Sequence, residues 1–156
     1  MANSAKMLII ALIISAVIVA GCADSPDSSE ETQGGTANPG SIKIGLVAPL
    51  SGGASDVGGD MKQAAILAVE EINAAGGVYV DEYQEKLPLE LVEGDTKTSP
   101  AEGVTAVERL ITQENVAVLV GGFSSGVTYA DEVPAAGKVA YVITGASSSS
   151  VTRRAD

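Results

Sequence analysis

The stretch that decides the fold, Val116–Thr128, reads VAVLVGGFSSGVT. Its first five residues are apolar and three of them are β-branched, which predicts a strand buried on both faces, as in a parallel sheet covered by helices. The glycines Gly121 and Gly122 then allow a sharp turn. Ser124 and Ser125 stand where the next helix should begin, and the unpaired N–H groups of a helix start favour an anion. This stretch therefore predicts half of a ligand-binding site.

Composition narrows the classes of function. The chain has 156 residues, 9 basic and 20 acidic side chains, a net charge of −11, one cysteine and no histidine. This acidic balance argues against nucleic acid as a partner, because phosphate binding requires basic clusters. A single cysteine excludes an internal disulfide and a cysteine-based metal cluster, and the missing histidine removes the commonest metal ligand and general base. We therefore expect neither a metal nor a cofactor.

The amino terminus has the pattern of a targeting segment over residues 1–21. Lys6 supplies positive charge, and a 13-residue apolar run follows from Leu8 to Ala20. This run is shorter than the ~20 residues of an ordinary membrane span, which favours a signal peptide. It ends in Val-Ala-Gly-Cys, which resembles a lipobox with Cys22 as the lipidated residue. The sequence thus predicts an extracytoplasmic lipoprotein that is held at the membrane through a lipid anchor.

Residues 22–40 are predicted to be a flexible tether. After Cys22 the segment reads ADSPDSSEETQGGTANPG and contains no large apolar side chain. Such a composition cannot bury enough surface to fold, and 18 residues of this kind reach roughly 20–25 Å. The folded lobe should therefore comprise residues 41–156.

From residue 42 onward, apolar strand patterns alternate with helix patterns. Strands are predicted over 42–48, 87–92, 116–120 and 139–143, and helices over 59–75, 100–113 and 124–136. In the first helix the expected buried face comprises Ala64, Ala65, Ala68 and Ile72, and residues 78–86 are expected to form a surface excursion. The alternation predicts an α/β fold with a parallel sheet of about four strands and helices on both faces.

Four loops should then meet at one edge of the sheet. In parallel sheets, ligands bind beyond the carboxyl ends of the strands. The loops at that edge are residues 49–57, 95–99, 121–125 and 144–150, and all are rich in Ser, Thr, Gly or Asp. They predict a site for a small polar molecule, with Ser51 among its candidate residues. Asp95 is a candidate as well, although an aspartate that caps its own loop is an equally good interpretation.

The ordered set of short motifs resembles a known family. These motifs are IKIGLVAPLSG (42–52), AVEEINAAGG (68–77), GDT (94–96), VGGFSS (120–125) and TGAS (144–147). Together they resemble the type I solute-binding proteins of ABC importers, and most closely the class that binds branched-chain amino acids. The resemblance implies a two-lobed protein that closes on an amino acid or a related amide and delivers it to ABC permease subunits.

The resemblance also implies roles for individual residues. Ser125 would bind the ligand carboxylate through its hydroxyl and N–H, with Ser124 as the alternative if the alignment shifts by one residue. Gly145 would offer its carbonyl to the ammonium group, and Ser147 would serve both groups. Val57 stands where close relatives carry a tyrosine over the ligand, so specificity for leucine does not follow. The family continues into a second lobe, whereas this sequence ends at residue 156, so we expect the amino-terminal lobe of a truncated chain or gene fragment, or a second lobe that is encoded separately.

Three alternatives compete with this interpretation. Residues 122–126 fit G-x-S-x-G, the nucleophile elbow of serine hydrolases, with Ser124 as the nucleophile, but the sequence has no histidine to activate it. A sensing or structural surface lipoprotein with the same lobe is also compatible with the sequence. A dinucleotide-binding fold is disfavoured because the first turn lacks G-x-G-x-x-G.

Overall fold

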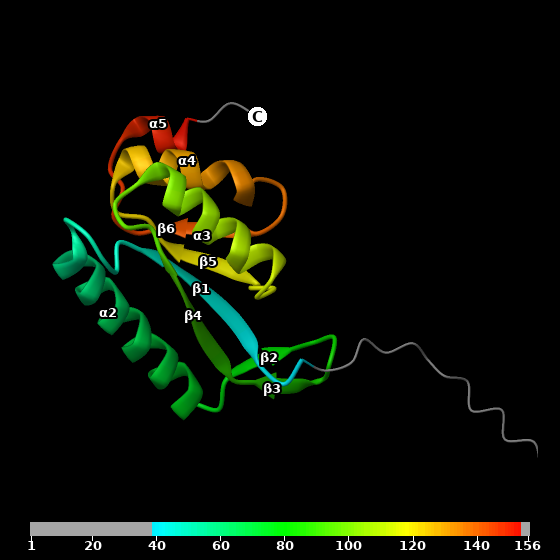
Figure 1. Ribbon diagram of the computed structural model, residues 1–156. Helices are drawn as coiled ribbons and strands as arrows, with labels where there is room; N and C mark the ends of the chain where they lie inside the picture. Colours follow the sequence, from blue (N-terminus) through cyan, green and yellow to red (C-terminus); the bar gives the residue numbers. More distant parts are fainter. Residues whose placement is uncertain (1–38, 154–156) are drawn as a thin grey trace, which may run out of the picture. The chain divides into compact units, whose positions relative to one another are not determined.

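The main sheet consists of four parallel strands in the order β4-β1-β5-β6 (Figure 1). The computed structural model describes residues 39–153, so the predicted signal peptide, the lipidation at Cys22 and most of the tether lie outside the described residues. The strands are β1 (Ile42–Ala48), β4 (Leu89–Asp95), β5 (Val118–Gly121) and β6 (Ala140–Ile143). The pairings of β1 with β4, β1 with β5, and β5 with β6 are all parallel, which confirms the predicted α/β sheet.

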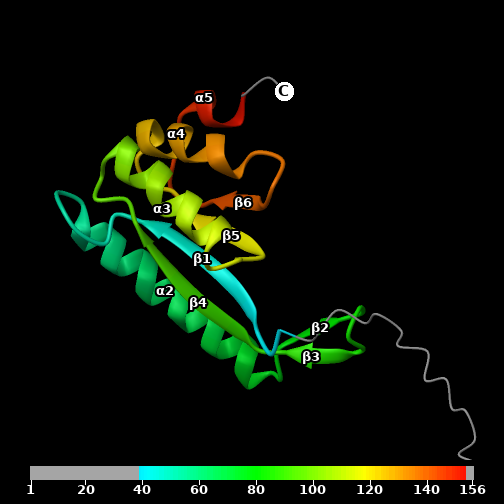
Figure 2. The same cartoon turned by 45° about the vertical axis from the view of Figure 1, so that its right-hand side comes forward.

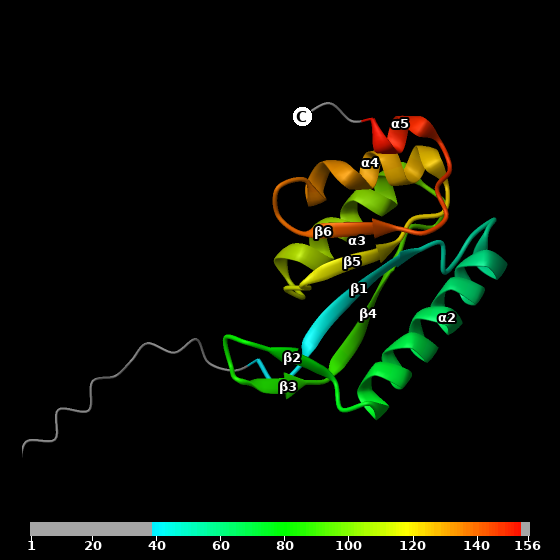
Figure 3. The same ribbon diagram turned by 180° about the vertical axis from the view of Figure 1, so that it is seen from behind.

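Helices cover the two faces of the sheet unequally. Helix α2 (Ser55–Ala74) lies on one face, whereas α3 (Pro100–Thr112) and α4 (Ser125–Ala135) lie on the other (Figures 1 and 3). A short helix, α5 (Ser149–Thr152), packs against α4 near the end of the described chain. Helices on both faces agree with the prediction from the alternating pattern.

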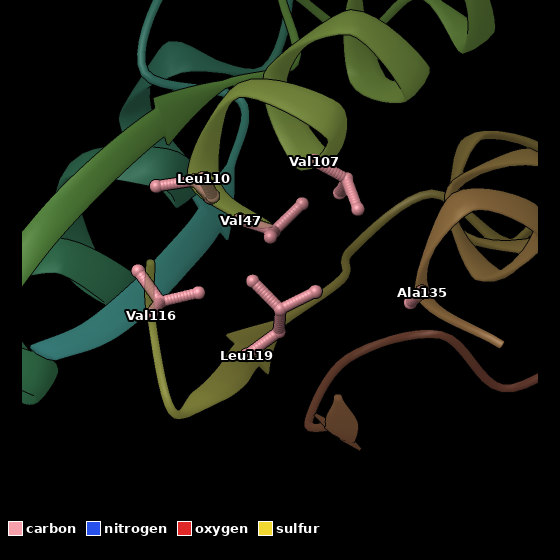
Figure 4. Close-up of a cluster of buried hydrophobic side chains, with 6 residues drawn as sticks. All are labelled: Val47, Val107, Leu110, Val116, Leu119 and Ala135. Atoms are coloured by element: carbon pink, nitrogen blue, oxygen red, sulfur yellow. The ribbon is translucent and has the colours of Figure 1, made fainter. Parts of the chain in front are cut away.

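The core lies between the sheet and the α3–α4 layer. Strands β1 and β5 face helix α3 there (Figure 4). Six buried side chains form the centre of the core: Val47, Val107, Leu110, Val116, Leu119 and Ala135. Leu110 and Leu119 have no exposed surface, and each contributes about 1.5–3 kcal/mol of apolar burial. This core fixes the register of β5, and therefore the position of the turn that follows it.

The opposite face of the sheet is only partly covered. The sequence predicts a strand over residues 116–120 that is buried on both faces, but Val118 and Val120 are half-buried and Val142 of β6 is 53% exposed. The reason is that, among the described helices, only α2 lies on this face, and it packs on β1 and β4 (Figure 3). An apolar groove remains between α2 and β5.

Helix α2 differs from the prediction in its first residue and in the exposure of its predicted buried face. It begins at Ser55 rather than residue 59, and its predicted buried face is open: Ala64 and Ala68 are exposed, as is Ile72. Ala64 and Ala68 line the apolar groove, together with Met61, Ala65, Leu46, Val120, Gly121 and Thr144. The helix is attached to β4 by Asn73, whose side chain donates to the Leu89 carbonyl (2.9 Å) and accepts from the Leu89 N–H (2.7 Å).

The segment predicted as a surface excursion is an antiparallel hairpin. Strands β2 (Val78–Val80) and β3 (Glu85–Leu87) pair and lie next to the start of β1 (Figure 2). Leu87 ends the hairpin as a buried residue, and Pro88 separates it from β4, which is why the predicted strand start at 87 is two residues early. The hairpin lies at the end of the sheet opposite the candidate site.

Candidate functional site

The candidate site lies at the carboxyl edge of the sheet. Because all four strands are parallel, the segments that leave β1, β4, β5 and β6 emerge at the same edge. The structure divides the predicted site residues between two groups on this edge. One group contains Ser51 and Asp95, and the other contains the turn after β5 and the loop after β6.

The turn after β5 depends on two glycines with positive φ. Gly121 has φ 126° and Gly122 has φ 75°, and the N–H of Gly122 donates to the Val47 carbonyl (2.8 Å). A Cβ atom on Gly121 would overlap that same carbonyl oxygen. Helix α4 then begins at Ser125, with Ser124 in an extended conformation before it and no side-chain cap from Ser124. The turn therefore presents both serines and the first N–H groups of α4 at the edge of the sheet.

The loop after β6 is hydrogen-bonded to this turn at three points. The N–H of Thr144 donates to the Gly121 carbonyl (2.8 Å), and the N–H of Gly145 donates to the Gly122 carbonyl (3.0 Å). Farther along, the N–H of Ser148 donates to the hydroxyl oxygen of Ser125 (3.2 Å). The structure therefore joins the turn that contains Ser125 to the loop that contains Gly145, although the two segments are far apart in the sequence.

Ser147 and Phe123 complete the surroundings of this group. Ser147 is exposed in the loop, directly before the residue that bonds to Ser125. Phe123 is 38% exposed and lies against Gly145, since a Cβ there would contact the Phe123 backbone at 3.3 Å and its ring at 3.6 Å. The arrangement places hydroxyls, backbone groups and one aromatic side chain on a surface that can contact a small molecule.

Ser51 and Asp95 are hydrogen-bonded to each other. The Asp95 carboxylate accepts hydrogen bonds from the Ser51 hydroxyl (2.5 Å), the Ser51 N–H (3.1 Å) and the Lys97 N–H (2.9 Å). Burial alone would raise the pKa of Asp95, but these hydrogen bonds outweigh it and hold the pKa below its ordinary value. The geometry therefore agrees with the loop-capping interpretation of Asp95, in which the Ser51 side chain is its partner.

Sequence reasoning missed a buried polar cluster directly behind the turn, formed by Thr128, Asp131 and Tyr141. Thr128 and Asp131 have no exposed surface, and their side-chain oxygens have no hydrogen-bond partner among the described residues; the same holds for the Tyr141 hydroxyl. Burial, and then the charge of Glu132, raise the pKa of Asp131 to about 7. A signal was present in the sequence, because Asp131 falls on the buried stripe of α4 with Val127, Thr128, Pro134 and Ala135.

The described residues show neither a cluster of metal ligands nor a membrane-spanning helix. Across residues 39–153, no group of three or more acidic, cysteine or histidine side chains is arranged to hold a metal ion. In the same range, no helix combines the length and apolar character needed to cross a bilayer.

Comparisons with known proteins agree with one another. The family model described as periplasmic binding protein matches residues 41–154. A Leu/Ile/Val-binding protein homolog 7 from Brucella abortus (strain 2308) is 36% identical over 114 residues, which cover 72% of this chain and 27% of that protein. An amino acid binding protein from Pseudomonas aeruginosa is 30% identical over 114 residues, covering 72% of this chain and 29% of the relative.

Solved structures give the same result. The branched-chain amino acid transporter substrate binding protein LivJ from Streptococcus pneumoniae, in complex with isoleucine, superimposes with a TM-score of 0.64 at 34% identity, covering 72% of this chain and 31% of LivJ. A solute binding protein of an ABC transporter from Rhodopseudomonas palustris BisB5, in complex with 3,4-dihydroxy benzoic acid, has a TM-score of 0.60 at 25% identity, covering 74% and 30%. This chain thus spans less than one third of the length of these relatives. It belongs to the periplasmic binding protein family.

Proposed function

We propose that this chain is the ligand-binding lobe of an extracytoplasmic solute-binding lipoprotein that serves an ABC importer. Its ligand is a small polar molecule, a branched-chain amino acid or a related amide, and it undergoes no covalent change. The observation that supports this proposal is the set of hydrogen bonds that joins the turn after β5 to the loop after β6, the two segments that contain Ser125 and Gly145.

The hydrogen bonds suit recognition of an α-amino acid. The oxygen of Ser125 accepts the N–H of Ser148, so its own hydroxyl proton is left to donate to a carboxylate. The adjacent start of α4 adds N–H groups and a partial positive charge that favour the same anion. Gly145 uses its N–H within the protein, so its carbonyl is the group assigned to the ligand ammonium, next to Ser147.

Relatives support the choice of ligand class and partners. LivJ is a branched-chain amino acid transporter protein in complex with isoleucine, and several relatives carry the name Leu/Ile/Val-binding protein. The BisB5 relative instead holds an aromatic acid, so a carboxylate is the feature common to both bound molecules. Permease subunits of an ABC transporter and a lipid anchor on Cys22 complete the proposal.

A single lobe provides one wall of a binding site. We therefore expect weak binding by this chain, with a Kd near 1 mM or above, which corresponds to about −4 kcal/mol or weaker. Tight binding would require a second wall that removes the ligand from water.

Amide NMR spectra of the ¹⁵N-labelled chain during titration with isoleucine test this function. The resonances expected to move are those of Ser124, Ser125, Gly145 and Ser147, whereas the Ser51 amide should stay still. Isoleucinol, which lacks the carboxylate, is the matched control and should leave the Ser125 amide unmoved. Shifts scattered over the hairpin, or equal responses to both compounds, would contradict the proposed site.

A further inference from the structure

The buried Asp131 lies between α4 and α3, on the side of α4 that faces away from solvent. No part of Asp131 is exposed. The facing residue on α3 is Gly103, and a Cβ atom there would overlap one carboxyl oxygen of Asp131. The close packing of the two helices at this point thus depends on a glycine on one helix and a carboxyl group on the other.

Among the described residues, the carboxyl group of Asp131 has no hydrogen-bond partner that would stabilise a negative charge. Within residues 39–153, neither oxygen of Asp131 accepts a hydrogen bond, and the buried hydroxyl of Thr128 lacks a partner too. An ionised carboxylate in such a place costs several kcal/mol unless it is paired, whereas the neutral acid costs much less. The surroundings therefore favour the protonated form.

The charged groups on the surrounding elements do not offset this preference. The neighbouring charge that acts on Asp131 is that of Glu132, which is acidic and raises the pKa further, and the titratable group of β6 near it is Tyr141. On α3, Glu102 pairs with Lys97, Arg109 pairs with Glu114, and Glu108 is exposed. The remaining basic side chains near these elements are exposed ones, Lys138 before β6 and Arg153 after α5.

The cluster is in contact with the candidate binding turn. A Cβ atom on Gly122 would lie 2.9 Å from the Thr128 hydroxyl and 3.0 Å from the Tyr141 hydroxyl, so both hydroxyls pack directly on this glycine. Thr128 is one helical turn before Asp131 on α4, and the charge of Asp131 acts on Tyr141. The Gly122 carbonyl in turn accepts the N–H of Gly145. A change at Asp131 therefore reaches both halves of the site through one layer of side chains.

We propose that Asp131 is a positioning residue that holds the Gly121–Ser125 turn in its binding geometry while its carboxyl group is protonated, and that ionisation of this group loosens the turn. The role of the turn in binding rests on the proposed function, but the coupling between Asp131 and the turn does not. The site is thus regulated by proton concentration on the side of the membrane where the lobe is located.

The direction of the pH effect follows from the raised pKa of Asp131, about 7 against an ordinary 3.8. Its contribution to stability is fully present below pH 3.8 and is lost as the pH rises through about 7. From these two values, the folding equilibrium constant should fall on the order of 10²-fold between pH 5 and pH 9 because of this one group.

Three measurements without ligand test the coupling. Carbon-13 NMR of the full chain should show the Asp131 carboxyl titrating near pH 7, and the amides of Gly122 and Ser125 should shift with the same midpoint. Urea unfolding at pH 5 and pH 9 should show the ~10²-fold change for the wild type. The Asp131→Asn variant should lack this change, whereas Asp60→Asn, which removes an exposed carboxylate from α2, should retain it.

Each outcome decides the proposal. A carboxyl that titrates near pH 4, or turn amides that do not follow it, would overturn the coupling. If Asp131→Asn does not fold, the titration of Asp131 and of the turn amides in the wild type still tests the coupling, because it needs no variant. Because no ligand is present in these measurements, a failure here is distinct from a failure of the isoleucine titration. With ligand, binding should weaken above pH 7 in the wild type and remain constant in Asp131→Asn.

Discussion

The Ser51 hydroxyl donates a 2.5 Å hydrogen bond to one carboxylate oxygen of Asp95, and the Ser51 N–H donates to the other at 3.1 Å. The two residues are 44 positions apart in the sequence, and their contact fastens the loop after β1 to the end of β4. Because Asp95 also accepts the Lys97 N–H, its carboxylate closes two loops at once.

Replacing Ser51 by Ala should therefore destabilise the lobe by about 0.5–1.5 kcal/mol, the usual net value of one hydrogen bond. The lowered pKa of Asp95 also predicts a pH dependence of stability. The stabilisation by the Asp95 carboxylate is present above the ordinary pKa of 3.8 and is lost as the pH falls through the lower pKa of the folded state. Urea unfolding at pH 6 and pH 2.5 measures both effects. This account would be contradicted if an Asp95→Asn variant lost as much stability between pH 6 and pH 2.5 as the wild type does.

Two adjacent glycines in α2 should respond in opposite ways to alanine. A Cβ on Gly58 would overlap the carbonyl oxygen of Pro49, which is backbone and cannot rotate away, whereas Gly59 has open space around it. Gly58→Ala should cost about 1–3 kcal/mol through forced backbone movement. Gly59→Ala should be neutral or stabilise by up to about 1 kcal/mol through helix propensity. Thermal denaturation compares the melting temperatures of the two variants. Equal melting temperatures would contradict this prediction and mean that the loop at Pro49 moves without cost.

Removing a core side chain should destabilise far more than removing an exposed one. Leu119 has no exposed surface and sits in the central cluster, so Leu119→Ala should cost about 2–5 kcal/mol. Leu67 on α2 is 57% exposed, and Leu67→Ala should change stability by less than about 0.5 kcal/mol. Urea unfolding monitored by circular dichroism measures both. A small effect at Leu119 would mean that the core is not packed as described.

Ser125 should carry a measurable share of ligand binding. In a two-lobed protein that includes this lobe, Ser125→Ala should weaken binding by about 1–3 kcal/mol, because the ligand carboxylate would lose its hydroxyl donor. Calorimetry with isoleucine measures the change, and Ser51→Ala is the matched control, since the Ser51 hydroxyl is engaged with Asp95. An unchanged affinity for Ser125→Ala would remove this residue from the site.

Membrane attachment should depend on Cys22. Because lipidation would require the thiol of Cys22, Cys22→Ser should move the protein from the membrane fraction to the soluble fraction or leave an uncleaved precursor. Fractionation and immunoblotting of cells that express each form measure this. Cys22→Ser that stays in the membrane fraction as a processed protein would argue against a lipid anchor.

The sequence by itself was sufficient for the order and type of the main elements. Valine-rich runs alternate with helix patterns, and this local periodicity directly predicts parallel strands joined by helices. The glycines at 121 and 122 likewise marked the turn, since positive φ is costly for other residues.

Only the tertiary structure decided which side chains meet. Ser51 bonds to Asp95, and Ser148 bonds to Ser125, through contacts between residues more than 20 positions apart, which no local pattern encodes. The same applies to Asp131, whose place opposite Gly103 is set by how α3 and α4 cross above the sheet. Periodicity is a property of neighbours along the chain, whereas a binding site and a buried carboxyl group depend on neighbours in space.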